Sequence, residues 1–255
     1  MTLTERIRSA PLVAFFVLAY GLTWPLAALV KISLAFGLLG LFGPAAAAII
    51  VARVCDGRAG VSDLWAKVRI WRVAPVWYGI VFLLPLAVSG AVALTARALG
   101  LASAIELSPI GPLNLVIFVL VIGEEIGWRG FALPRLINRF GVGRAALLLG
   151  LLWGLWHFPT FFIKGAPQSE VPIASYLAYT TALSGAFTWI WLHTRGSVLL
   201  ATLFHGAVNT VGFTAVGLAP PERMWLTAGA WSLCVILLLA LGQERTATAQ
   251  APGVP

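Results

Sequence analysis

Two adjacent carboxylates and an arginine interrupt an otherwise apolar stretch of the chain. They are Glu124, Glu125 and Arg129, within residues 121–131. Side chains four residues apart share one face of a helix, so Glu125 and Arg129 can pair, whereas Glu124 is turned about 100° away. We therefore predict that Arg129 neutralises Glu125 and that Glu124 is left available for chemistry. The same Glu-Glu-x-x-x-Arg pattern is also compatible with a salt-bridge cluster that only holds helices together.

Two later apolar stretches carry the remaining polar candidates. His157 follows Trp153 by one helical turn, and His205 and Asn209 are also four residues apart. His205 and Asn209 would project from one side of a helix, where converging donors can stabilise an anion. His157 either takes part in the same chemistry or only packs between helices, because Gly154 would let a neighbouring helix approach closely.

A carboxylate, an imidazole and a His/Asn donor pair are the groups that hydrolysis of an amide requires. A base takes a proton from water, an acid protonates the leaving amine, and donors hold the developing oxyanion. The three stretches reach similar depths when a rise of about 1.5 Å per residue is counted from the expected helix ends, so we expect one site. Glu124, His157 and His205 are also acceptable zinc ligands. The residues are therefore compatible with metal-free hydrolysis and with the zinc-dependent hydrolysis of a metalloprotease. They do not establish a cofactor.

The composition indicates where these helices lie. Hydrophobic residues make up 60% of the 255 residues and charged residues only 10%, far from the averages of soluble proteins. We predict an all-α, polytopic membrane helix bundle with about eight transmembrane helices, in a single integral membrane domain over residues 1–255. The apolar runs approach the roughly 20 residues that cross a bilayer. These runs are 11–30, 34–53, 75–97, 112–134, 143–163, 173–193, 198–217 and 224–242.

The basic residues gather in alternate loops, and such a bias sets the orientation of a multi-span protein. If the N-terminus lies inside, the other side holds only Lys31, Arg97, Lys164 and Arg223. The cytoplasmic set is then Arg6, Arg8, Arg53, Arg58, Lys67, Arg69, Arg72, Arg129, Arg135, Arg139, Arg144, Arg195 and Arg245. We therefore expect both termini in the cytoplasm and the protein in a bacterial cytoplasmic (inner) membrane. Anchoring against anionic headgroups explains the basic loop 53–72 without nucleic acid.

The three motifs together resemble the CAAX-prenyl-endopeptidase and bacteriocin-processing family of intramembrane proteases, which includes abortive-infection-type bacterial proteins. The family pattern is Glu-Glu-x-x-x-Arg, then Phe-x-x-x-His, then His-x-x-x-Asn. This chain has the three in the same order within residues 112–217, ending at Arg129, His157 and Asn209. It departs from the pattern at Trp153, which stands where the family has Phe and keeps the aromatic character.

The resemblance implies an eight-helix bundle whose membrane-embedded cavity opens toward the cytoplasm and cleaves peptide bonds with water. By position it implies that Glu124 and His157 activate the water. It likewise implies that His205 and Asn209 stabilise the oxyanion. The expected partners are a protein or peptide substrate and membrane lipids.

The resemblance assigns Glu125 and Arg129 a supporting role beside the chemistry. The alternative is a non-enzymatic membrane protein, either a transporter or a bacteriocin self-immunity or scaffold protein, that keeps the polar cluster for structure. A transporter more often shows repeat symmetry and broken helices in corresponding halves. The chain has no obvious repeat of this kind, which favours the enzyme.

Overall fold

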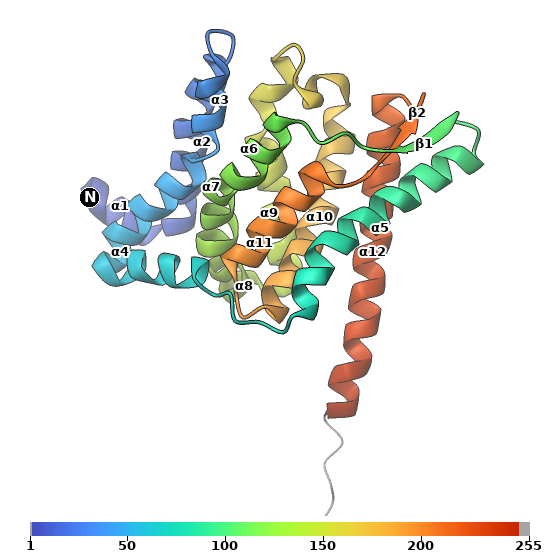
Figure 1. Cartoon of the computed structure of the whole chain (residues 1–255). Coiled ribbons are helices and arrows are strands. Elements are labelled where there is room, and N and C mark those ends of the chain that lie inside the picture. The colour runs from blue at the N-terminus through green and yellow to red at the C-terminus, as the bar shows by residue number, and fades with distance from the viewer. Residues whose placement is uncertain (1, 250–255) are drawn as a thin grey trace, which may run out of the picture.

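The fold is a bundle of helices with one short two-stranded sheet, seen in a computed structural model (Figure 1). The structure describes residues 2–249, and side chains of residues 2–240. The helices are α1 (Leu3–Ser9), α2 (Pro11–Ala28), α3 (Leu34–Gly40), α4 (Gly43–Val68), α5 (Val76–Ala98), α6 (Pro112–Leu120), α7 (Ile122–Glu125), α8 (Leu133–Phe140), α9 (Val142–Trp156), α10 (Ile173–His193), α11 (Val198–Thr210) and α12 (Pro220–Ala249). A π-helical segment, Ile126–Ala132, joins α7 to α8, and two 3-10 turns, Phe158–Phe162 and Pro167–Glu170, follow α9.

The predicted class, a polytopic helical membrane bundle, is confirmed. Within the described residues, five helical stretches are long and apolar enough to cross a membrane: Pro11–Ala28, Leu34–Val68, Val76–Ala98, Val142–Phe162 and Pro220–Ala240. The count of eight stays a prediction, because α10 and α11 are not among these five. The 13 residues of α11 extend about 20 Å at 1.5 Å per residue, less than the roughly 30 Å hydrocarbon layer. The sides on which the termini lie also stay predictions, and residues 1 and 250–255 are outside the described residues.

The run 112–134 is not the single continuous helix that its hydrophobicity predicts. It divides into α6, α7, the π-helical segment and α8, and two of its glycines bring its backbone against the start of α4. A Cβ added at Gly123 would lie 2.7 Å from the carbonyl oxygen of Leu41, and one at Gly127 would lie 2.5 Å from Cβ of Pro44. This close approach turns the glycine face toward α4 and the carboxylates of the same segment toward the rest of the bundle.

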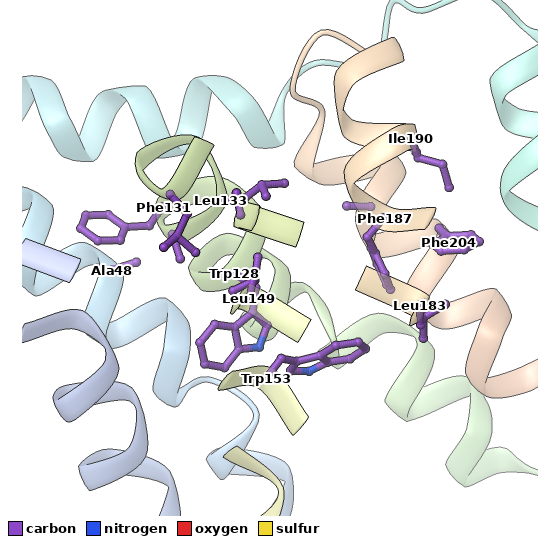
Figure 2. Close-up of a cluster of buried hydrophobic side chains, with 14 of the residues drawn as sticks. Ala48, Trp128, Phe131, Leu133, Leu149, Trp153, Leu183, Phe187, Ile190 and Phe204 are labelled. Atoms are coloured by element: carbon purple, nitrogen blue, oxygen red, sulfur yellow. The ribbon is translucent and has the colours of Figure 1, made fainter. Parts of the chain in front are cut away.

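A cluster of buried aromatic and aliphatic side chains supports the segment from the other side (Figure 2). The cluster includes Trp128 and Phe131 of the π-helical segment, Leu149 of α9, Phe187 of α10 and Phe204 of α11, and all five are fully buried. Between membrane helices such contacts stabilise the bundle through van der Waals packing rather than through removal of apolar surface from water. The cluster therefore fixes how α9, α10 and α11 lie around the carboxylates.

A small sheet lies beyond the end of α11 and was not predicted. Strand β1 (Ala104–Leu107) pairs antiparallel with β2 (Phe213–Val216). The pair is extended by a hydrogen bond of 2.9 Å between the hydroxyls of Ser108 and Thr214. The sheet thus fastens the residues after α11 to those before α6, and it replaces the last turns of the expected helix 198–217.

Candidate active site

Glu125 is held by two cationic or ionisable partners inside the bundle. Its Oε1 lies 2.8 Å from Nη1 of Arg129 and 2.7 Å from Nδ1 of His205. The side chains of Glu125 and Arg129 are 0% exposed, and the guanidinium carbon lies 3.6 Å from the ring centroid of Phe187 and 4.7 Å from that of Trp153. The predicted pairing of Glu125 with Arg129 is confirmed, and His205 is a second partner of Glu125 that was not predicted.

Glu124 points in a different direction and has a different partner. It is 2% exposed, and its Oε2 accepts a hydrogen bond of 2.9 Å from the indole Nε1 of Trp153. Unlike Glu125, it lies on the wall of a cavity. The two adjacent carboxylates are therefore separated as the helical period predicts, one within the bundle and one at a cavity.

His157 lies just past the last residue of α9, where it is held by the backbone. Its Nδ1 is 2.9 Å from the carbonyl oxygen of Trp153. A carbonyl only accepts, so Nδ1 carries the hydrogen, and the neutral ring then has its lone pair on Nε2. Trp156 and Tyr176 pack edge-on against the ring, with centroids 4.7 and 5.3 Å away. The environment thus favours one tautomer, in which Nε2 can accept a proton.

A cavity of about 540 Å³ collects the four residues predicted to do chemistry. Glu124, His157, His205 and Asn209 all line it. They come from α7, the end of α9 and α11, which are separate along the chain but adjacent in the bundle (Figure 1). The structure therefore brings together the residues that the three motifs nominate.

The same wall carries polar residues that were not predicted as part of the site. Asn114, Gln168, Tyr176 and Arg223 line the cavity. Arg223 is its only lining Lys or Arg and has no ion-pair partner among the described side chains. An arginine in that position can hold a carboxylate. The sequence offered little indication that these residues belong to the site. Arg223 was considered only in the count of basic residues on each side of the membrane, and Tyr176 lies in a helix rich in aromatic residues.

The residues of the zinc alternative do not form a recognisable metal-ligand group. Among the described residues, no three His, Cys, Asp or Glu side chains lie close enough together to hold a metal ion. The geometry of Glu124, His157 and His205 thus gives the metalloprotease interpretation no support, and we derive no step through a metal.

Fold and site together define a class: polytopic helical membrane proteins with carboxylate, imidazole and amide side chains around an internal cavity. Comparison with known proteins agrees with the family resemblance. Residues 106–211 match the model of the type II CAAX prenyl endopeptidase Rce1-like family. This segment contains all three motifs, so the resemblance predicted from them is confirmed.

Two curated relatives are similar over the same part of the chain. A CAAX prenyl protease 2 of Methanococcus maripaludis is 34% identical over 103 residues, which are 37% of this chain and 38% of the relative. The CAAX prenyl protease 2 of Homo sapiens is 32% identical over 130 residues, 48% of this chain and 39% of the relative. The chain thus spans less than two fifths of the length of these relatives.

Proposed function

We propose that the protein is an intramembrane endopeptidase that hydrolyses peptide bonds of a protein or peptide substrate within the cavity. One observation carries the proposal: Glu124, His157, His205 and Asn209 line a single cavity of about 540 Å³, a volume within the usual range of ligand pockets. The names of the relatives support hydrolysis of peptide bonds in particular. Whether a prenylated substrate is used is part of the test.

Glu124 and His157 are the groups that activate the water. Both contact Trp153, Glu124 through the indole nitrogen and His157 through the carbonyl oxygen. A water molecule between the carboxylate and Nε2 of His157 loses a proton to this pair and attacks the substrate carbonyl carbon. When the C–N bond breaks, the proton passes to the leaving amine, so the pair returns to its starting state.

His205 and Asn209 stabilise the oxyanion that forms in this attack. They lie one turn apart on α11 and both face the cavity. Nδ1 of His205 lies 2.7 Å from Oε1 of Glu125, so donation from Nε2 to the oxyanion as well requires a hydrogen on both ring nitrogens. Glu125 thereby acts as a positioning residue for His205, and Arg129 holds Glu125.

The decisive experiment compares cleavage of a peptide panel by the purified full chain and by Glu124→Gln. The panel contains unmodified peptides and peptides with a prenylated cysteine near the C-terminus, each with and without a metal chelator. The exposed Glu106 of β1 supplies the matched control, Glu106→Gln. We expect loss of cleavage only in Glu124→Gln. Equal cleavage by all three proteins would show that Glu124 is not catalytic, and no cleavage by any of them would favour the non-enzymatic alternative.

A further inference from the structure

The cavity is open at one end of the bundle and closed at the other. Its deep wall is buried, with Glu124 2% and His205 4% exposed. Its rim includes Pro167, after α9, and Arg223, in the first turn of α12, both of which are exposed. The mouth therefore lies among the turn from α2 to α3, the connection from α9 to α10, and the start of α12. Figure 1 shows these three parts of the backbone at the upper end of the bundle.

The helices that line the cavity contribute only their ends near this mouth. From α2 the wall has Thr23 and Ala27, close to its C-terminal end. From α10 it has Tyr176 and Tyr179, in the first two turns, and Leu183, at the middle of the helix. The opposite ends of α2 and α10 are remote from the cavity.

Those opposite ends carry the basic loops, which are tied to one another. Arg195, just after α10, donates from Nη1 to the carbonyl oxygen of Arg72 at 3.4 Å. The neighbouring Ser197 donates to the carbonyl oxygen of Ile70 at 2.6 Å. Figure 1 shows both connections, α4 to α5 and α10 to α11, at the lower end of the bundle, away from the start of α12. The cavity mouth and the basic loops are thus at opposite ends.

The distance between the two ends matches the thickness of a bilayer. The 21 residues of α10 run from Ile173, at the mouth, to His193, beside the basic loops. At about 1.5 Å per residue this helix extends roughly 30 Å, the thickness of the hydrocarbon layer. In a bilayer that α10 crosses, the mouth and the basic loops therefore face opposite sides.

We infer that the cavity opens to the extracytoplasmic side and takes a peptide segment presented outside the cytoplasm. An excess of Lys and Arg marks the cytoplasmic loops of membrane proteins, and here this excess lies at the end without the mouth. A cytoplasmic mouth and cytoplasmic basic loops, both expected from the sequence, are incompatible in this structure. The charge bias is a property of this chain, whereas a mouth on the cytoplasmic side was expected only from the family resemblance. We therefore orient the chain in the membrane by its charge bias.

The orientation is tested by cysteine labelling, which needs no enzymatic activity. In full-length protein with Cys55 and Cys234 replaced by serine, single cysteines are placed at the exposed Ser169, near the mouth, and the exposed Asn138, next to Arg139. A membrane-impermeant maleimide is added to intact bacterial cells that express each variant, before or after permeabilisation. We expect Ser169→Cys to be labelled at least tenfold more than Asn138→Cys in intact cells, and equally after permeabilisation. The reverse pattern, or equal labelling of both in intact cells, overturns the inference.

The nature of the substrate rests on the proposed function and is tested separately. A membrane-impermeant peptide that the purified protein cleaves is offered to right-side-out and to inside-out membrane vesicles, with Glu124→Gln as background. We expect at least tenfold faster cleavage in right-side-out vesicles, and faster cleavage in inside-out vesicles contradicts the inference. If labelling shows an outward mouth but the purified protein cleaves nothing, the proposed function fails while the orientation stands.

Discussion

The indole nitrogen of Trp153 lies 2.9 Å from a carboxylate oxygen of Glu124, and the carbonyl oxygen of Trp153 lies 2.9 Å from Nδ1 of His157. One residue thus positions both groups that we propose to activate water. The family pattern has Phe at this position, and Phe has no N–H to donate. The hydrogen bond to Glu124 is therefore a property of this chain that the pattern does not supply.

Trp153→Phe removes this hydrogen bond and keeps an aromatic ring against Phe187 and His205, whose centroids lie 5.6 and 5.4 Å away. Hydrogen bonds to charged groups are worth about 1.5–3 kcal/mol. We expect kcat to fall roughly tenfold to hundredfold with little change in KM, measured by steady-state cleavage. Trp191→Phe is the matched control, because the Trp191 indole nitrogen is buried without a partner among the described residues. An equal loss in both variants would show that only packing is affected.

Arg129→Ala leaves Glu125 as a buried carboxylate without its cation. Removing one partner of a buried ion pair costs roughly 3–5 kcal/mol, so we expect a large fall in the thermal unfolding temperature in detergent. The exposed Arg139 gives the control Arg139→Ala, with little expected change.

The double variant Glu125→Gln/Arg129→Ala separates the pair from other effects of the arginine. It leaves no uncompensated carboxylate, so we expect it to be more stable than Arg129→Ala. The losses of stability in the single variants Arg129→Ala and Glu125→Gln are measured for comparison. If the loss in the double variant equals the sum of these two losses, the two side chains do not interact.

Asn209→Ala tests the oxyanion role. Loss of one such donor costs about 10²–10³ in kcat in characterised enzymes, and we expect that range here with KM nearly unchanged. Circular dichroism and thermal unfolding should match the unaltered protein. Asn138→Ala, at an exposed position of α8, is the control. A rise in KM without a fall in kcat would assign Asn209 to substrate binding instead.

Arg223→Gln tests whether the rim of the cavity binds a carboxylate. Exposed ion pairs are worth about 1 kcal/mol or less, so we expect KM to rise roughly twofold to fivefold for a peptide with a free carboxylate. The same peptide as an amide, with no acidic side chain, should be cleaved equally by both proteins. Arg97→Gln, an exposed arginine elsewhere, is the matched substitution. An equal change for the acid and the amide would contradict this role.

Local spacing made part of the site predictable. Glu125 and Arg129 are four residues apart on one helical face, so their pairing and the divergence of Glu124 follow from the helical period alone. The other contacts depend on tertiary structure. His205 meets Glu125 across 80 residues, and Trp153 meets Glu124 across 29. The motifs indicated which residues gather, but not that Trp153 would donate to one carboxylate.

The fold was predictable in class and less so in detail. Hydrophobicity located α10 at residues 173–193, where the structure has it. It did not show the division after Leu120 or the π-helical segment Ile126–Ala132, because an apolar run gives no local signal for either. The strands were also missed, since β1 and β2 are four residues each and pair across more than a hundred residues.

The ion pair between Glu125 and Arg129 has a consequence for how the chain is made. Both residues lie on one helical segment, so the pair can close while that segment enters the bilayer, before any later helix exists. His205 is 80 residues further on and arrives only after α9 and α10 have been synthesised. The segment thus brings one carboxylate into the membrane already balanced, and the remaining polar partners are added as the bundle assembles around it.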